Sequence, residues 1–381
     1  MSDAPAQITW LDDGGQPQHV DWRSLAGHPA PARVRVADEQ LAADAAFRLI
    51  AQGQALLWRG GYPQARQLLQ ALGRRLDRRQ QRPARPAASL AEAFVQQRQQ
   101  QAERARLLGQ LLLPFEADHG LPLARAPDVR AAGLQAHGPV GRHYVASLRE
   151  LLGLVGAFEW RRKGVLIPAL GASIHPYHGV FSPVRGEYVD LLAAAALPAA
   201  AAQAQGAFDI GTGTGVLAAL LARRGLRVLA TDLSAAALAC AADNLQRLGL
   251  AGQVTLLQAD LFPPGLAGLI VCNPPWVPAP AHASLDAAVY DPDSRMLRGW
   301  LAGLAPHLAP GGEGWLILSD LAEHLGLRPR AQLLGWIAAA GLRVLGRDDT
   351  RPAHRRALDA ADPLHAARSA EVTSLWRLGA A

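Results

Sequence analysis

The C-terminal half of the chain alternates short apolar runs with segments whose apolar residues recur at helical spacing. Short apolar runs bounded by turn residues are typical of parallel strands buried on both faces. We therefore expect strands at residues 207–210, 228–231, 254–258, 269–272, 315–319, 342–346 and 372–378. Helices are expected between them at 216–224, 235–248, 296–308 and 330–340. This alternation predicts a doubly wound, Rossmann-like α/β domain of seven strands over residues 188–381.

The first 150 residues have a mostly helical pattern instead. Apolar positions at helical spacing run from residue 39 to 58 and stop at Gly60-Gly61. A second helix is expected at 63–76, and these two helices are expected to form a helical hairpin. A linker is expected at 82–88 and a third helix at 89–112. We expect a helical N-terminal substrate-recognition domain at 1–150, a short-strand connector at 151–187 and the α/β domain at 188–381.

Composition narrows the class of protein. A chain of 381 residues is long enough for two or three domains. Two cysteines, Cys240 and Cys272, exclude a disulfide framework, a multi-cysteine zinc site and a cysteine-ligated iron–sulfur cluster. The longest apolar stretch, 189–202, is too short to span a membrane, and the N-terminus has no signal-peptide pattern. We expect a cytoplasmic protein without a membrane partner.

The net charge of +6 comes almost entirely from arginine, because Lys163 is the only lysine. A basic balance normally raises the prospect of a nucleic-acid partner. Here the arginines are spread along the chain, apart from a group between Arg74 and Arg85. Net charge is therefore weak evidence for such a partner.

A glycine-rich segment, Asp209-Ile210-Gly211-Thr212-Gly213-Thr214-Gly215, lies directly between an expected strand and an expected helix. Counted from Gly213, it fits the dinucleotide-binding fingerprint, and Asp232 stands 19 positions further on, where a ribose-binding acid is expected. An NAD enzyme therefore competes with other nucleotide-cofactor enzymes on this motif alone.

The charge of Asp209 favours a different cofactor. The pyrophosphate of NAD brings two negative charges to this turn, and Asp209 would repel them. S-adenosylmethionine brings a sulfonium and an ammonium against one carboxylate, so an acid attracts it. Asp260, after the third strand, is placed to accept from an adenine amino group, with Leu261 or Phe262 against the ring. The expected cofactor-binding residues are Asp209, Gly211, Thr212, Gly213, Gly215, Asp232, Leu233, Asp260, Leu261 and Asn273.

Asn273-Pro274-Pro275-Trp276 follows the fourth strand and carries the candidate chemistry. The prolines fix the backbone and remove competing N–H donors, so the Pro274 carbonyl and the Asn273 side-chain oxygen are two acceptors on a rigid turn. Together they can hold both hydrogens of a planar amine, with Trp276 available for stacking. Such catalysis rests on orientation and on dispersal of developing charge, without a titratable base. All four residues are expected catalytic residues.

At these motifs the sequence resembles the class I S-adenosylmethionine-dependent methyltransferases with an Asn-Pro-Pro-aromatic motif, and most of all the release-factor glutamine N5-methyltransferases. The resemblance runs from about residue 148 to the end and includes the connector Pro183 to Glu187. The family usually has tyrosine where Trp276 stands.

The resemblance implies S-adenosyl-L-methionine as cofactor and a release-factor-like or ribosomal protein as substrate. It implies methionine-end contacts at Asp209, Gly211 and Gly213, ribose contacts at Asp232, adenine contacts at Asp260, and target binding at Asn273 and Pro274.

Two other functions stay open. An N-methyltransferase of an exocyclic base amine in rRNA, tRNA or DNA would flip the base out and stack it on Trp276. A helical partner-binding protein with a vestigial cofactor fold is the non-enzymatic alternative, and intact Asp209, Asp232 and Asn273 argue against it. The sequence leaves the oligomeric state open.

Three further features are expected to be structural. We expect no metal site at His175 and His178, because acidic or cysteine neighbours at ligand spacing are missing. Asp291 is expected to cap a helix, and Cys272 to be a buried strand residue.

Overall fold

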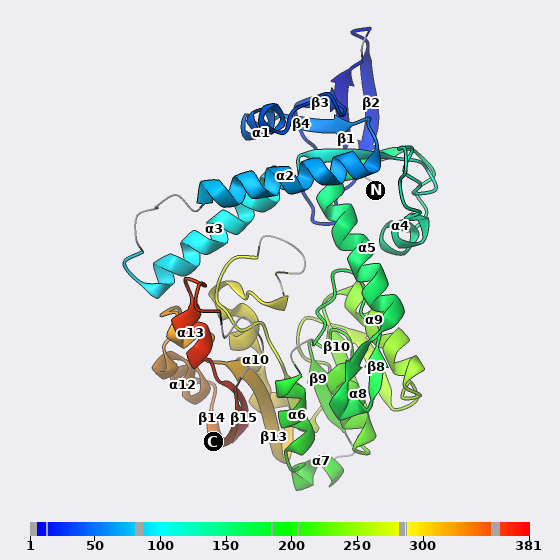
Figure 1. The fold of residues 1–381 in the computed structure, drawn as a ribbon. Helices are drawn as coiled ribbons and strands as arrows, with labels where there is room; N and C mark the ends of the chain where they lie inside the picture. The colour runs from blue at the N-terminus through cyan, green and yellow to red at the C-terminus, as the bar shows by residue number, and fades with distance from the viewer. Residues whose placement is uncertain are drawn as a thin grey trace. The chain divides into compact units, whose positions relative to one another are not determined.

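The computed structural model describes residues 6–12, 14–80, 87–183, 186–203, 206–281, 286, 288–351 and 359–381. The chain divides into two compact units, each considered by itself below (Figure 1). Unit 1 contains Met1–Ala87 and Val95–Glu159, and unit 2 contains Ala88–Phe94 and Trp160–Ala381. The division falls inside helix α3 (Leu90–Leu108), whose first residues belong to unit 2.

Unit 1 contains a six-stranded sheet in the order β1-β2-β6-β5-β4-β3. The strands are β1 (Gln7–Leu11), β2 (Pro17–Trp22), β3 (Val34–Ala37), β4 (Ala55–Trp58), β5 (Leu111–Phe115) and β6 (Tyr144–Ser147). Its helices are α1 (Ala43–Ala51), α2 (Tyr62–Gln80), most of α3, α4 (Arg130–His137) and most of α5 (Leu148–Lys163). Strands β3, β4 and β5 are parallel, so α1 lies in the crossover from β3 to β4.

The expectation of a mostly helical N-terminal domain is therefore corrected. Residues 55–58 were expected to end the first helix, but they form β4, which pairs with β3 and β5. The expected helical hairpin is absent because this strand separates α1 from α2. The end of the expected helix 89–112 likewise enters β5. Most of the linker expected at 82–88 lies outside the described residues.

The core of unit 1 lies on both faces of its sheet. Along β4, Leu56 and Trp58 pack with α1, α2 and α5 residues, whereas Ala55 and Leu57 pack with Ile8 and other residues on the opposite face. Such a strand is apolar at every position because neither face meets water.

Unit 2 contains a seven-stranded sheet in the order β11-β10-β9-β12-β13-β15-β14. The strands are β9 (Ala207–Ile210), β10 (Val228–Asp232), β11 (Val254–Gln258), β12 (Ala267–Cys272), β13 (Leu308–Ser319), β14 (Leu342–Thr350) and β15 (Thr373–Ala380). The last strand, β15, is antiparallel to both of its neighbours, and the pairs among β9 to β13 are parallel. The order of strands reverses between β9 and β12.

Helices cover both faces of this sheet (Figure 1). They are α6 (Glu187–Ala194), α7 (Ala199–Gln203), α8 (Val216–Arg223), α9 (Ala235–Arg247), α10 (Arg295–His307), α11 (Leu321–His324), α12 (Arg330–Ala339) and α13 (His365–Ala370). Leu269 and Val271 of β12 pack with the α8 side, and Ile270 and Cys272 with the α10 side. The expected doubly wound domain is confirmed.

Local signals explain where the elements of unit 2 begin and end. Ser234 accepts a hydrogen bond from the backbone N–H of Ala237 and so caps α9, as expected. Gly249, with φ of 71°, follows the end of that helix.

The expectation of short strands is wrong for residues 151–163 of the connector, which belong to α5 because Leu148, Leu151 and Leu154 form a buried stripe at helical spacing. The rest of the connector contains a hairpin of β7 (Val165–Ile167) and β8 (Ala172–Ile174), with the short 3-10 helix η1 (Pro168–Leu170) between them. Its residues 184 and 185 lie outside the described residues. Within the described part of the chain, no helix combines the length and apolarity that crossing a membrane requires.

Candidate active site

The candidate site lies at the carboxyl edge of the unit 2 sheet, where the strand order reverses. Cys272, the last residue of β12, pairs with Ile210, the last residue of β9. The glycine loop after β9 and the Asn273 turn after β12 therefore begin on neighbouring strands. Open α/β sheets bind ligands at this kind of switch point.

Asp209 is buried beneath the glycine loop, with 1% of its surface exposed. Its Oδ2 accepts from the Thr212 hydroxyl at 2.7 Å and from the Ala218 N–H at 3.1 Å. Its Oδ1 is buried and has no hydrogen-bond partner among the described residues. Burial, with a smaller contribution from the negative charge of Asp232, raises the pKa of Asp209 to about 6. A buried acid with one free oxygen is suited to a cationic ligand group.

Three glycines of the loop have positive φ, which side-chain-bearing residues rarely adopt. A Cβ at Gly213 would meet open space, so the backbone there is accessible. A Cβ at Gly215 would lie 3.1 Å from the Ala241 side chain. Gly215 therefore allows α8 and α9 to approach closely, and of these two glycines only Gly213 is free to face a ligand.

Asp232 ends β10 and holds the glycine loop. Its Oδ2 accepts from the Gly213 N–H at 3.0 Å, and its Oδ1 accepts from the Ser234 N–H at 2.9 Å. Each carboxylate oxygen keeps a second lone pair, and the side chain is only partly buried. The next residue, Leu233, is 63% exposed and leaves an apolar surface beside these lone pairs.

Asp260 is less free than the sequence suggested. Its side chain forms an ion pair with Arg295 at 2.6 Å, and half of it is exposed. Phe262 does not face a ligand space, because its ring stacks on His307 with centroids 4.5 Å apart. Leu261 has a φ of 76°, and its carbonyl accepts from the Thr231 hydroxyl at 2.6 Å. Leu261 and Phe262 were the two residues expected to lie against adenine. Leu261 has a partly exposed side chain that is not stacked on another ring, so it is the better placed of the two.

The turn after β12 has an internal hydrogen bond that the sequence did not suggest. The indole N–H of Trp276 donates to Oδ1 of Asn273 at 2.8 Å. This oxygen keeps one lone pair, and no described residue donates to the Pro274 carbonyl. Two acceptors therefore remain on the turn. Trp276 is half-buried, and the Tyr188 ring meets it edge-on with centroids 6.2 Å apart.

Three further residues support the site and were missed from the sequence. Tyr188 is buried, and burial raises the pKa of its phenol, while a hydrogen bond with Asn273 lowers it. Asn244 donates to the Thr214 carbonyl at 2.9 Å and accepts from the His175 N–H at 2.7 Å, which ties the glycine loop to the connector. Arg328 donates to the Trp276 carbonyl at 3.3 Å. No motif marks these residues, because each acts through a distant partner.

The residues expected to be structural take structural positions. Burial raises the pKa of the Cys272 thiol well above its usual range, which fits an inert strand residue. Asp291 accepts from the N–H groups of Met296 and Leu297 and so caps α10. His175 contacts the Arg161 carbonyl through Nδ1 at 2.6 Å. Among the described residues, no cluster of three or more His, Cys, Asp or Glu side chains is arranged to hold a metal ion.

The strand order, the glycine loop and the Asn-Pro-Pro-Trp turn together define a Rossmann-like domain of the methyltransferase type. Residues 171–324 match the family model of the methyltransferase small domain. The matched residues include the glycine loop and the turn.

The similar curated proteins are methyltransferases. A release factor glutamine methyltransferase of Moorella thermoacetica is 44% identical over 116 residues, which cover 28% of this chain and 41% of the relative. A release factor glutamine methyltransferase of Cereibacter sphaeroides is 41% identical over 145 residues, which cover 36% of this chain and 48% of the relative. A ribosomal RNA small subunit methyltransferase C of Alcanivorax borkumensis is 33% identical over 114 residues, covering 29% and 30%. The chain thus spans less than half the length of these relatives.

Proposed function

We propose that the chain is an S-adenosylmethionine-dependent N-methyltransferase that acts on a planar nitrogen, with a protein glutamine amide as the substrate. The observation that carries this proposal is the adjacency of Asp209 and the Asn273–Trp276 turn on paired strands. The names of the relatives from Moorella thermoacetica and Cereibacter sphaeroides support the glutamine substrate. The two free, buried cysteines agree with a cytoplasmic location.

The residues at the switch point fit the cofactor. The unpartnered Oδ1 of Asp209 is suited to the ammonium or sulfonium end, and the open backbone at Gly213 allows close approach. The free lone pairs of Asp232 are suited to ribose hydroxyls, and exposed Leu233 to the adenine face. When bound, S-adenosylmethionine supplies an electrophilic methyl group. Adenine recognition by Asp260 requires that carboxylate to share or leave Arg295.

The turn orients the acceptor nitrogen. Asn273 Oδ1 and the Pro274 carbonyl accept the N–H groups of the substrate, which directs the nitrogen lone pair away from the turn. Transfer of the methyl group would break its bond to sulfur and leave positive charge on the nitrogen, which both oxygens stabilise; the nitrogen would then release one proton to solvent, so no general base is needed while the new bond forms. Trp276 contributes by holding Oδ1 through its indole N–H.

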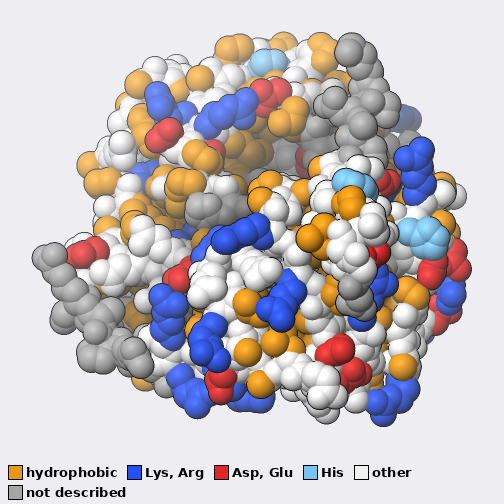
Figure 2. Space-filling model, turned by 90° about the horizontal axis from the view of Figure 1, so that it is seen from above, with side chains coloured by type: hydrophobic (Ala, Val, Ile, Leu, Met, Phe, Trp, Pro, Cys, Tyr) orange, Lys and Arg blue, Asp and Glu red, His pale blue; other side chains and the backbone are white. Residues whose placement is uncertain are grey.

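The alternative substrate is an exocyclic amine of a nucleic-acid base. The partly exposed Trp276 side chain and the relative named as a ribosomal RNA methyltransferase favour it. On the face shown in Figure 2, however, basic side chains lie in separate groups among acidic and apolar ones rather than in one continuous patch. The RNA alternative therefore ranks second.

The test is transfer of labelled methyl groups from S-adenosylmethionine to a purified bacterial release factor and, in parallel, to bulk RNA. Label on a glutamine of the protein, located by mass spectrometry of tryptic peptides, is the expected result. Label on RNA alone, with binding that weakens steeply with salt, would replace the glutamine substrate by a base amine. A wild-type protein that neither binds S-adenosylmethionine nor transfers methyl groups would refute the enzyme.

A further inference from the structure

Arg328 is a buried cation to which the proposed chemistry assigns no role. Only 1% of its surface is exposed, although arginine is rarely buried unless it is paired. Its Nη2 donates to the Trp276 carbonyl at 3.3 Å, and its Nη1 reaches the Ser294 hydroxyl at 3.5 Å. Its Nε has no hydrogen-bond partner among the described residues. Burial lowers the pKa of this guanidinium, which reflects the cost of keeping the charge there.

The contacts of Arg328 only partly compensate this cost. The carboxylates of Glu323 and Asp291 raise the pKa of Arg328, but the oxygens of Asp291 already accept two backbone N–H groups. The two hydrogen bonds that the guanidinium makes with described residues are long, at 3.3 and 3.5 Å. A buried charge with so few close partners lowers the stability of the fold, and a well-packed apolar side chain of similar size often gives an equally stable protein. Fold stability alone therefore gives a poor account of Arg328.

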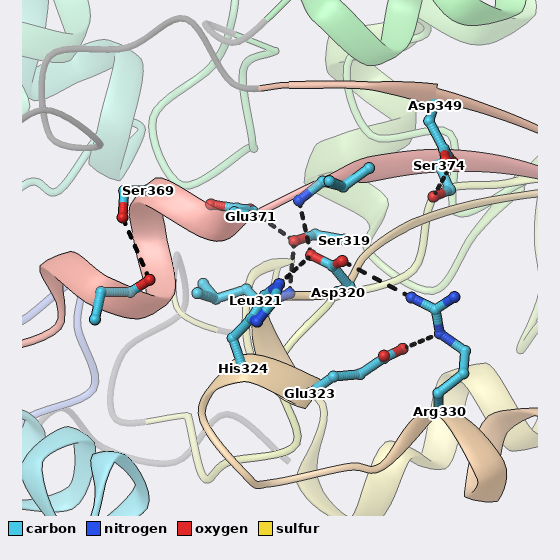
Figure 3. Close-up of polar contacts among 12 residues, drawn as sticks. Ser319, Asp320, Leu321, Glu323, His324, Arg330, Asp349, Ser369, Glu371 and Ser374 are labelled. Carbon is cyan, nitrogen blue, oxygen red and sulfur yellow. Dashed lines mark hydrogen bonds and ion pairs between the residues drawn. The ribbon is translucent and has the colours of Figure 1, made fainter.

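The backbone around Arg328 is firmly held. Its own N–H and that of Leu327 both donate to the Ala322 carbonyl in α11. On either side, Arg330 donates to Glu323 at 2.6 Å and Ser319 donates to buried Glu371 at 2.6 Å (Figure 3). The segment between α11 and α12 thus presents the guanidinium from a fixed base at the carboxyl edge of β13.

Of the two groups that Arg328 contacts, the Trp276 carbonyl belongs to the turn and Ser294 belongs to a strained segment that supports it. Val277 forms a backbone bridge with Tyr290, and the Asp291 N–H donates to the Val277 carbonyl at 2.9 Å. Asp293 and Ser294 follow with φ of 55° and 52°, a conformation that costs energy for residues other than glycine. Arg328 joins the Trp276 carbonyl to Ser294 and so connects the turn with this support.

We propose that Arg328 is a positioning residue of the proposed methyl transfer. Arg328 donates to the Trp276 carbonyl and thereby fixes the backbone at the end of the Asn273–Trp276 turn. The indole N–H of Trp276 then holds Asn273 Oδ1, and the Pro274 carbonyl keeps its direction. The proposal rests on the proposed function, since it assigns Arg328 to the residues that orient the acceptor nitrogen.

The experiment compares Arg328→Met and Arg328→Lys with wild type in the full chain. Single-turnover and steady-state methyl transfer are measured with the acceptor that wild type labels, either the release factor or bulk RNA. R328M is expected to lower kcat about tenfold or more, because a charged hydrogen bond that orients the turn is lost. KM for the acceptor and Kd for S-adenosylhomocysteine are expected to stay within about threefold of wild type. R328K keeps the positive charge and an N–H donor, so we expect its kcat to lie between those of wild type and R328M.

Arg377→Met is the matched control. Arg377 forms a bidentate ion pair with Glu313 in the middle of β13, six residues before the carboxyl end of that strand. We expect this variant to unfold at a lower temperature while kcat per folded molecule is kept. Hydrogen exchange supplies a readout that needs no acceptor. R328K should speed exchange at the Val277 and Asp291 N–H groups and leave the Gly213 N–H unchanged.

The outcomes separate the two hypotheses. If wild type transfers methyl groups while R328K and R328M keep kcat within twofold, Arg328 is not a positioning residue. The same conclusion follows if kcat falls only in proportion to the unfolded fraction. If R328M does not fold, R328K decides by its kcat and its exchange at Val277. A wild type without any methyl transfer refutes the proposed function, and with it the role of Arg328.

Discussion

Replacing Asp209 by asparagine is expected to strengthen the fold and weaken cofactor binding at the same time. The side chain is fully buried, and its pKa rises from 3.8 to about 6, mainly through burial. At about 1.4 kcal/mol per unit, a rise of two units corresponds to a penalty of about 3 kcal/mol for the charged form. Asparagine has nearly the same shape, and its oxygen can still accept from Thr212 and Ala218. We expect D209N to raise the unfolding free energy by about 1–3 kcal/mol at pH 8, allowing for an unpaired amide N–H.

The sign of the pH dependence follows from the raised pKa. Below about pH 3.8 the carboxyl is protonated in both the folded and the unfolded chain, so it causes no penalty there. Between 3.8 and about 6 the unfolded chain ionises first, and wild type loses stability as the pH rises. Above about 6 the penalty is constant. The advantage of D209N should therefore appear between pH 4 and 6 and then level off.

Cofactor affinity should respond in the opposite direction. S-adenosylmethionine carries a net positive charge, so its binding favours ionised Asp209 and releases a proton below about pH 6. D209N should weaken binding by about 1.5–3 kcal/mol, the usual contribution of a hydrogen bond to a charged group. Wild-type affinity should fall as the pH drops through 6, whereas the affinity of D209N should stay flat.

Two measurements check this prediction. Chemical unfolding from pH 4 to 8 gives the stability difference, and calorimetry with S-adenosylmethionine over the same range gives affinity and proton release. Asp190→Asn, at an exposed position of α6, is the control and should change neither quantity. A D209N protein that is less stable than wild type at pH 8 would refute the burial penalty. Unchanged affinity would show that Asp209 only caps the loop.

Three further substitutions test other parts of unit 2. Asn273→Ala should leave S-adenosylmethionine affinity nearly unchanged and lower turnover by about two orders of magnitude, measured in single turnover at saturating cofactor; undiminished transfer would make Asn273 a mere loop residue. Asp232→Ala should weaken cofactor binding by about 1.5–3 kcal/mol in calorimetry, since it removes a charged acceptor and frees the Gly213 N–H. Equal affinity would exclude Asp232 from the site. Phe94→Ala should lower the unfolding free energy by about 3 kcal/mol, because this buried ring packs on Val277 in unit 2, and unchanged calorimetric unfolding would contradict that packing.

The fold of unit 2 was predictable because its strands are apolar runs separated by strong turn signals. Every expected strand and helix of that domain is present; most boundaries shift by a few residues, and β13 begins at Leu308, seven residues before the expected start at Trp315. Unit 1 was not predictable in the same way. The strand Ala55–Trp58 has four buried apolar residues, and a run this short fits a helix or a strand equally well. The helix ends at Ala51, with Gln52 as its C-cap just before Gly53, which has a φ of 79°, whereas Gly60-Gly61 is a stronger break signal further along the chain.

The candidate site shows the same limit. Asp209 and Asn273 could be identified because Asp209 is the last residue but one of β9 and Asn273 directly follows β12, the two strands at the switch point. Phe262 was misplaced because its ring turns toward His307 and packs over Gly303, a contact between residues far apart in the sequence. Arg328 has no motif around it. Its role depends on a carbonyl 52 positions away, which only the tertiary structure reveals.

The division of α3 between the two units has a consequence for synthesis on the ribosome. Phe94 is translated before its main partners, because the buried cluster it joins in unit 2 includes Val277, Leu325, Leu364 and Ala367. Its side chain therefore stays without its native partners until about 270 more residues have been made. During this interval an aromatic side chain near the beginning of α3 is exposed on the nascent chain, and such surface invites aggregation or chaperone binding. Completion of this cluster in unit 2 thus depends on residues that are translated long after Phe94.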